Sequence, residues 1–484
     1  MSSTTTELGS LPQAHRSQDR SQHHPANDSN NANEHDLREH GFREFSNEFV
    51  VPEGLVQQAL LPTTRKRQVV VLISAFCTVF QTIGINQAYG VFQNYYVSTA
   101  DSPDSILPPS QASNKALVAF IGTLAAGLTW SGSIFVNPLM ARTKDLRWIT
   151  LTGVLLMSLG YGLAGFSTRI WHLFLTQGFL YGIGTSLLYF PILSIAPEYF
   201  DTHRGAAMGF ILSGAGVGAL VLSPIIRMLL DRIGIRWTLR ILALINFAVG
   251  LPIGCSASPS RSSVRRPTLV NISIAKKPKF CLQALAALLQ ASGNFVPLTF
   301  LPEFSSALGY TATTGALLLS LNNGVNSASR IVMGIAADKM GRQNTLIISV
   351  LGSAISVWAL WLGAAIDGSK SLWIAFVILY GLTAGGYNAL FPTTITEVFG
   401  IQAYASVNGF IYFVRGLGAL FGSPVGGAIL GSQESSIASS GKQILRGFIK
   451  VIWYDGALLF SCSLCVIGVR AFDAYEKRLW KWKA

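Results

Sequence analysis

The chain has 484 residues, of which half are hydrophobic and only 12% are charged. A soluble domain carries roughly twice that share of charge, so this composition excludes an ordinary soluble protein and requires much of the apolar surface to face lipid. The formal net charge of +13 therefore indicates membrane topology and attraction to anionic lipid rather than nucleic-acid binding.

Residues 1–64 are rich in Ser, Gln, Asn and His and have almost no apolar runs, so they cannot bury a core. We predict a disordered cytoplasmic tail. Five of the seven histidines lie in it, and their irregular spacing favours a solvated tail over a metal site. No basic segment followed by a short apolar core opens the chain, so we expect no cleavable signal peptide.

From residue 65 onward, long apolar stretches alternate with short polar loops. Twelve stretches have about the length that a membrane-spanning helix needs. The predicted spans are 69–92, 116–136, 149–166, 172–195, 206–228, 237–255, 280–301, 314–336, 345–365, 372–393, 405–430 and 449–471. With both termini in the cytoplasm, Lys and Arg concentrate in the inner loops, as the positive-inside rule requires.

A polar, basic segment over 256–279 separates the sixth and seventh predicted spans. We interpret it as a cytoplasmic linker between two six-helix bundles, the first over 65–255 and the second over 280–472, with a cytoplasmic tail over 473–484. The predicted fold class is an all-α integral membrane protein with twelve transmembrane helices in two pseudo-symmetric halves.

The two halves share a sequence pattern at an offset of about 200 residues. The repeated residues are Gly216, Gly218, Ser223 and Pro224 in span five with Gly416, Gly418, Ser423 and Pro424 in span eleven, and Phe190-Pro191 in span four with Phe391-Pro392 in span ten. Two parallel repeats of this kind place a solute site at their interface near the membrane midplane, reachable from either side by rocking. The pattern therefore predicts transport by alternating access.

After span eight, residues 334–342 read Gly-Ile-Ala-Ala-Asp-Lys-Met-Gly-Arg. This segment resembles the cytoplasmic signature of the major facilitator superfamily, in which acidic and basic residues form a charge latch at the inner helix ends. The resemblance implies gating roles for the glycines and charged residues of the segment, Gly334, Asp338, Gly341 and Arg342. The equivalent loop of the first half, 137–142, lacks the acid.

Within that superfamily the chain most resembles the monocarboxylate porters, especially their fungal branch. Residues 199–204 with Ala207 and Gly209 are similar to the porters' approach to span five, and residues 90–93 to the end of their span one. The porters' acidic-glycine signature has its match, 52–54, well upstream of the usual place. The resemblance implies the major facilitator fold and a small-molecule substrate, and we expect no cofactor and a functional monomer.

An ionised side chain at mid-bilayer costs at least about 2.5 kcal/mol, so it is by default a functional candidate. Arg330 follows Asn322 and Asn326 at four-residue intervals in span eight, so the three share one helix face and offer a carboxylate a cation flanked by amides. Arg330 also matches the substrate-binding arginine of the porter family, and pairing with backbone carbonyls is the alternative. Arg415 in span eleven is a second substrate candidate that could equally pair with a neighbouring helix.

Animal porters of this family take up protons through a lysine in span one and an aspartate four residues before the arginine. Here these positions are Gln87 and Asn326, whose amides do not titrate, so proton-coupled lactate transport is not implied. Asp455, towards the outer end of span twelve, is a proton-coupling candidate. Tyr387 and Asn388 in span ten indicate hydrogen bonds to a polar or aromatic solute, or to neighbouring helices.

We therefore expect a secondary transporter of a small organic anion or polar aromatic metabolite, with Arg330 as the anchor and Gln87, Asn326, Tyr387 and Asn388 as further contacts. Uptake and export of a secondary metabolite both remain open. The alternative of another class is a sensor that keeps the fold without transporting. A membrane enzyme would need paired acids, a metal cluster or an activated nucleophile, and we find none. The plasma membrane is the expected location, with the vacuolar membrane as the alternative.

Overall fold

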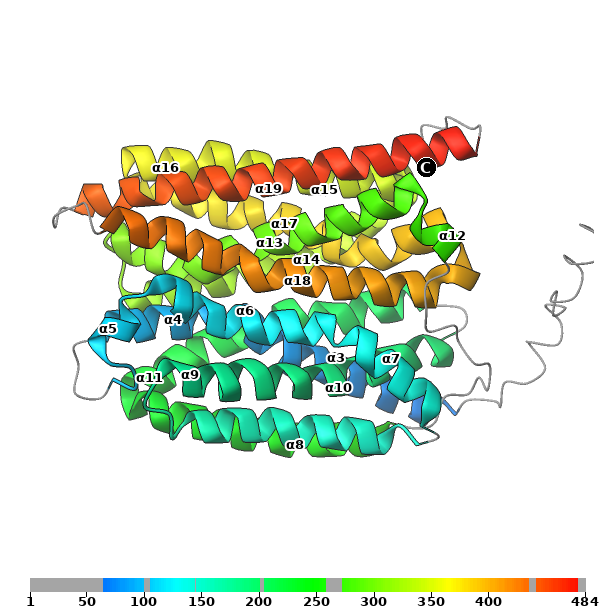
Figure 1. The fold of residues 1–484 in the computed structure, drawn as a ribbon, viewed down its shortest axis with the longest axis horizontal. Helices are drawn as coiled ribbons and strands as arrows, with labels where there is room; N and C mark the ends of the chain where they lie inside the picture. The colour runs from blue at the N-terminus through cyan, green and yellow to red at the C-terminus, as the bar shows by residue number, and fades with distance from the viewer. Residues whose placement is uncertain are drawn as a thin grey trace, which may run out of the picture. The chain divides into compact units, whose positions relative to one another are not determined.

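The computed structural model describes residues 64–99, 105–143, 145–200, 204–257, 272–434 and 441–477. These residues form helices that run side by side, and they contain no strand (Figure 1). The predicted all-α fold is confirmed for this part of the chain. The predicted tail over 1–64, apart from Thr64, the centre of the predicted linker and the end of the last tail lie outside the described residues.

Six spans come from the first half of the chain. They are α3 (Arg65–Gln87) continuing as α4 (Tyr89–Ser98), α6 (Lys115–Ser131) continuing as α7 (Ser133–Arg142), α8 (Arg147–Ala164), the run α9 (Ile170–Leu173), η1 (Phe174–Leu180) and α10 (Tyr181–Ile195), and two spans within α11 (Arg204–Ser256). Short helices α5 (Pro109–Ala112) and η2 (Ala196–Tyr199) lie between them. The two spans of α11 meet at Gly234, whose φ of 72° is a backbone conformation that glycine adopts without strain.

The second half supplies six more spans. They are α13 (Pro278–Ala307), α14 (Ala312–Met340), the run α15 (Arg342–Ser356), η3 (Val357–Trp361) and α16 (Leu362–Asp367), α17 (Lys370–Phe399), α18 (Ile401–Glu434) and α19 (Gly441–Glu476). The short α12 (Ile272–Ala275) precedes them. Several helices extend beyond the predicted spans; α13, for example, runs to Ala307 where the sequence predicted an end at 301.

Nine stretches of the described residues are long and apolar enough to cross a membrane. One of them, Ala207–Ser256, has 50 residues and holds two spans. Helices α8 and α14 are the remaining spans; α14 is less apolar because it carries Asn322, Asn326 and Arg330, the residues expected to bind substrate. The described helices therefore account for all twelve predicted spans.

The internal repeat is visible in how the two halves pack against each other. A side chain on Gly216 of α11 would collide with the backbone of Asn323 on α14, and one on Gly416 of α18 would collide with the backbone of Ser131 on α6. Both contacts join one half to the other. Matching glycines therefore allow matching close approaches of helices at the interface between the halves.

The neighbouring pair of glycines repeats a contact inside each half. Gly218 of α11 lies against the backbone of Phe80 on α3, and Gly418 of α18 lies against the backbone of Leu288 on α13. These are the fifth and first helices of each half. The sequence repeat therefore encodes two structurally similar six-helix units, which is the architecture that alternating access requires.

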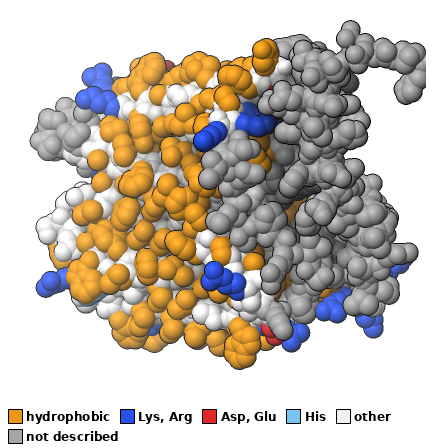
Figure 2. All heavy atoms as spheres, turned by 45° about the vertical axis from the view of Figure 1, so that its right-hand side comes forward, with side chains coloured by type: hydrophobic (Ala, Val, Ile, Leu, Met, Phe, Trp, Pro, Cys, Tyr) orange, Lys and Arg blue, Asp and Glu red, His pale blue; other side chains and the backbone are white. Residues whose placement is uncertain are grey.

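The outside of the described bundle is apolar. Large side chains such as Phe135, Trp148 and Leu244 are 74%, 72% and 69% exposed, and Figure 2 shows hydrophobic side chains covering most of the described part of one face. Apolar groups in such number are stable on the surface only in contact with lipid.

Candidate functional site

Arg415 of α18 is a buried cation at the interface between the halves, with 4% of its surface exposed. Its Nη2 donates to Gln290 Oε1 of α13 at 3.4 Å and to Asn388 Oδ1 of α17. Both partners are neutral amides, and the Nε atom of Arg415 is buried without an acceptor among the described residues. Arg415 therefore offers a positive charge and a spare hydrogen-bond donor.

Four aromatic rings surround the guanidinium of Arg415, and we call them the aromatic box. The guanidinium carbon lies 5.1 Å from the ring centroid of Trp130, 5.6 Å from that of Phe391, 5.7 Å from that of Tyr387 and 6.0 Å from that of Tyr412. These distances are within the range of cation–π attraction. Trp130 comes from α6 in the first half and the other three rings from the second, so both halves build the box.

Tyr412 is held between rings of both halves. It stacks on Trp130 at 5.4 Å and 22°. The rings of Phe190 and Phe391 meet it edge-on at 6.0 Å and 5.7 Å. Phe190 and Phe391 belong to the repeated Phe-Pro pairs. Equivalent phenylalanines of the two halves therefore contact the same tyrosine. Neither Trp130 nor Tyr412 was identified as a site residue from the sequence.

Arg330 of α14 is also buried, and its nitrogens bond within the protein. Nε and Nη2 donate to Asn326 Oδ1 at 3.2 and 3.1 Å, and Nη1 donates to the carbonyl oxygen of Leu212 on α11. The guanidinium thus joins the two halves. Its bond to the carbonyl oxygen of Leu212 is the backbone pairing that the sequence analysis left open as the alternative to substrate binding. The Arg330 guanidinium lies close enough to that of Arg415 for the two positive charges to repel each other.

The other predicted substrate contacts divide into two groups. Tyr387 and Asn388 lie directly against Arg415, as one ring of the aromatic box and as an acceptor. Asn322, in contrast, donates to the carbonyl oxygen of Val377 at 2.7 Å, inside the second half. Gln87 is buried, and its Oε1 has no hydrogen-bond partner in the described part of the chain.

Asp455 lies deeper in the bundle than the sequence suggested. A side chain on Gly293, which is halfway along α13, would come within 3.2 Å of Asp455 Oδ1. The carboxyl group is fully buried, and neither of its oxygens has a hydrogen-bond partner among the described residues. The carboxyl group therefore lies beside the middle of α13, whereas the sequence placed it towards the outer end of span twelve.

The predicted gating residues lie where α14 meets α15. Gly341, with a φ of 93°, makes the turn between the two helices. Arg342 Nη1 lies 4.0 Å from Glu397 Oε2 on α17, and Gln343 Nε2 donates to the other oxygen of Glu397 at 3.1 Å. Asp338 is exposed. The acid paired with Arg342 is thus Glu397, a residue that the sequence analysis did not identify as a gating residue.

A wider polar network continues from this turn. Gln343 also donates to Asp473 Oδ2 on α19 at 3.1 Å, and Lys477 Nζ lies 2.7 Å from the same oxygen. The network joins the inner ends of α15, α17 and α19. Gly334 is half-buried within α14, with open space where a side chain would be.

At the opposite end of the molecule, an ion pair joins the two halves directly. Lys115 Nζ at the start of α6 lies 2.6 Å from Glu303 Oε1 near the end of α13, and the two side chains are only 7% and 12% exposed. The sequence prediction missed this pair because it ended span seven at 301. By the predicted topology, the pair closes the outer side of the interface.

Replacing Lys115 by Met is expected to destabilise the closed outer side. It leaves the Glu303 carboxylate buried without its partner, which costs about 3–5 kcal/mol. The measurement is the melting temperature of the purified protein in detergent. The charge-exchanged double variant, Lys115→Glu with Glu303→Lys, should recover most of the loss, and a single variant as stable as wild type would contradict the role of the pair.

Comparisons with known proteins extend over most of the chain. A family model described as Major Facilitator Superfamily matches residues 47–423. The MFS-type transporter pynF of Aspergillus niger is 28% identical over 423 residues, which cover 87% of this chain and 91% of that protein. The aspyridones efflux protein apdF of Emericella nidulans is 26% identical, covering 88% and 84%. Human monocarboxylate transporter 11 is 28% identical, covering 70% and 75%.

A solved structure has the same fold. The bacterial homolog of the human lysosomal transporter Spinster, crystallised in an inward-facing and unoccupied conformation, superposes with a TM-score of 0.63. The two sequences are 14% identical, and the match covers 87% of this chain and 100% of the other.

Proposed function

Because this chain belongs to the major facilitator superfamily and is a membrane transporter of that family, we propose that its cargo is a planar aromatic organic anion. The anion binds between the two halves, with its charge on Arg415 and Arg330 and its ring system against the aromatic box. The observation that supports this proposal is the buried guanidinium of Arg415, which has an unused hydrogen-bond donor and is enclosed by aromatic rings from both halves.

The two buried arginines indicate that the cargo is negatively charged. Neither is within ion-pair distance of a carboxylate in the part of the chain that the structure describes. Their acceptors are amide oxygens and one backbone carbonyl. An uncompensated cation in the membrane is costly, and a carboxylate or sulfonate that binds a planar guanidinium through two hydrogen bonds would compensate it.

The aromatic box indicates that the cargo has an aromatic ring system. Trp130, Tyr387, Phe391 and Tyr412 present large apolar faces next to the cation, and a flat ring system stacks on such faces favourably. A short aliphatic acid such as lactate would leave these rings without contact. The cargo is therefore larger than the simplest monocarboxylates.

We further propose that the protein works as a monomer in the plasma membrane and moves its cargo outward. Export is supported by relatives such as apdF, which is named for aspyridone efflux. No chemical step is assigned to the protein. Within the described residues, no group of three His, Cys, Asp or Glu side chains could hold a metal ion.

The proposal is tested by comparing aromatic acids inside and outside cells that lack the protein, overproduce it, or overproduce its Arg415→Gln variant. An aromatic anion should accumulate inside the cells that lack the protein and outside those that overproduce it. The variant should behave like the deletion. Removal of residues 1–60 should leave export unchanged, whereas a sensor working through its tail would lose its output. If no aromatic anion is redistributed, the proposed cargo class is wrong.

A further inference from the structure

Asn408 of α18 has a buried hydrogen-bond acceptor that no described residue uses. Its side chain is half-buried, and its Oδ1 atom lacks a hydrogen-bond partner in the described part of the chain. A buried acceptor without a donor costs free energy, so such an atom calls for a water or a ligand that donates to it.

Asn408 shares a helix face with Arg415. The two residues are nearly two helical turns apart, so their side chains leave α18 in almost the same direction, separated by about 10 Å along its axis. Tyr412, a ring of the aromatic box, lies between them on the same face. A cargo that binds Arg415 with its acid group and rests on Tyr412 can therefore extend along α18 to Asn408.

Asn408 also lies where the two halves meet. The carbonyl oxygen of the adjacent Gly409 accepts a hydrogen bond from Ser133 Oγ of α7 at 2.8 Å, and a side chain on Gly409 would come within 2.8 Å of Asn137 Nδ2. By the predicted topology, α18 enters the membrane from the cytoplasm, which places Asn408 on the cytoplasmic side of Arg415. The unused acceptor is thus at the same interface as the anion site.

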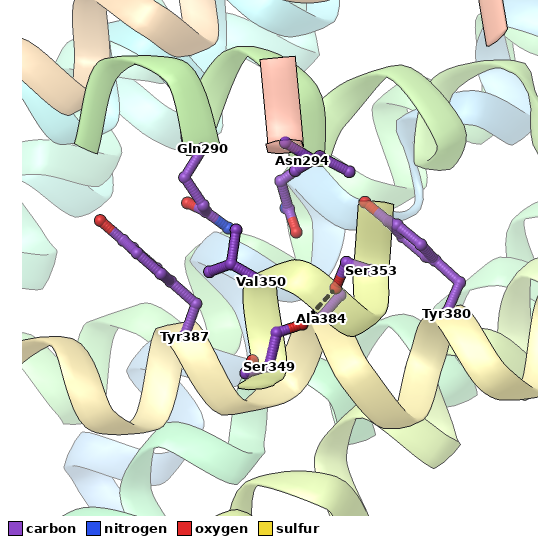
Figure 3. A pocket seen from close by; sticks show the side chains of 9 residues that line it. Gln290, Asn294, Ser349, Val350, Ser353, Tyr380, Ala384 and Tyr387 are labelled. Carbon is purple, nitrogen blue, oxygen red and sulfur yellow. Dashed lines mark hydrogen bonds between the residues drawn. The ribbon is translucent and has the colours of Figure 1, made fainter. Parts of the chain in front are cut away.

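A separate polar cavity accounts for other unpaired groups near Arg415. Gln290 and Asn294 of α13 and Tyr380 and Tyr387 of α17 extend into the gap between these helices (Figure 3). The cavity has a volume of about 10 Å³, about the size of one water molecule, so it is too small for a cargo. A water there can bind the two tyrosine hydroxyls, which lack partners among the described residues. Asn408 does not line this cavity, so that water leaves its acceptor unpaired.

We propose that Asn408 selects a cargo that carries a hydroxyl group at the end of its ring system opposite the acid group. The hydroxyl donates to Asn408 Oδ1 while the acid group binds Arg415. The proposal rests on the anion site proposed above and narrows the cargo to hydroxylated aromatic anions, with a ring system long enough to match the separation of about 10 Å. A cargo without the hydroxyl leaves the buried acceptor unpaired, so it binds more weakly.

The test uses the purified full chain in lipid vesicles and radiolabelled naphthalene-2-sulfonate as the probe. This anion has the ring system and the charge but no hydroxyl, so exchange of labelled for unlabelled probe measures the anion site by itself. Two competitors then test Asn408. In 6-hydroxynaphthalene-2-sulfonate the hydroxyl is at the end opposite the sulfonate, and 6-methoxynaphthalene-2-sulfonate has the same oxygen without a proton to donate.

With wild-type protein, the hydroxyl compound should bind about 2- to 12-fold more tightly than the unsubstituted probe, which is the gain expected from one hydrogen bond. The methoxy compound should show no such gain. Asn408→Leu removes the acceptor at a similar side-chain volume, so it should bind the hydroxyl compound and the probe with equal affinity. Asn246→Leu removes a buried asparagine from the second span of α11 and should keep the wild-type preference.

Equal binding of the three compounds by wild-type protein would overturn the role of Asn408 and leave the anion site standing. A gain from the methoxy group equal to that from the hydroxyl, or an Asn408→Leu variant that keeps the preference, would also overturn it. If Asn408→Leu does not reach the membrane, Asn408→Ala is compared in the same way. If wild-type protein does not even exchange the probe, the anion site is wrong and the selection by Asn408 falls with it.

Discussion

Replacing Arg415 by Gln is expected to lower the affinity of the transporter for naphthalene-2-sulfonate by about 10- to 150-fold. A hydrogen bond to a charged group contributes about 1.5–3 kcal/mol, and each 1.4 kcal/mol is tenfold in affinity. Gln can still bond to Asn388 and Gln290, the present partners of Arg415, so the packing should survive while the charge is lost. The measurement is the concentration dependence of probe exchange in vesicles.

Two further variants separate the charge of Arg415 from its shape. Arg415→Lys keeps the charge but loses the planar fork and the stacking on the aromatic box, so its affinity should lie between those of wild type and Gln. Arg232→Gln removes an exposed arginine of α11 and should change nothing. An Arg415→Gln variant with wild-type affinity would remove this residue from the site.

Replacing Arg330 by Ala is expected to abolish flux while the protein still inserts into the membrane. The change removes the second buried cation. It also removes the hydrogen bonds from Arg330 to Asn326 within α14 and to the carbonyl oxygen of Leu212 on α11. Exchange of the probe should fall below detection, and the amount of protein in the membrane should stay close to that of wild type. Unchanged exchange would show that Arg330 has only a structural role.

Replacing Asn326 by Asp tests whether this residue shares the substrate site with Arg330. Both Nε and Nη2 of Arg330 already donate to Asn326 Oδ1, so a carboxylate there would form an ion pair with the guanidinium and compete with the cargo. Protonation of the new acid removes this competition. Exchange by the variant should therefore be weak at neutral pH and rise as the pH falls, whereas a pH profile equal to that of wild type would contradict the shared site.

The sequence predicted the spans and the duplication because both depend on patterns along one helix. A run of apolar residues is needed wherever backbone meets lipid, and repeated glycines such as Gly216 and Gly416 mark equal close approaches in each half. Arg330 and Arg415 were visible for the same reason, since a charge within an apolar run is conspicuous. These features needed no knowledge of tertiary contacts.

The aromatic box could not be predicted because aromatic residues are common in membrane helices. Nothing along α6 distinguishes Trp130, which meets Arg415, from Trp148 on α8, which is exposed to lipid. The partner of Arg342 was missed for a related reason: Glu397 is 55 residues away along the chain and becomes a neighbour only when α15 packs against α17. Contacts between distant helices decide both cases.

The central claim is that two similar six-helix halves carry an aromatic anion past a shared cationic site. It is tested most directly by counterflow, in which vesicles that contain the purified protein and unlabelled naphthalene-2-sulfonate are diluted into a trace of labelled probe. We predict that wild-type vesicles transiently concentrate the label and that Arg415→Gln vesicles do not. Failure of the label to enter wild-type vesicles, or equal entry with both proteins, would contradict the claim.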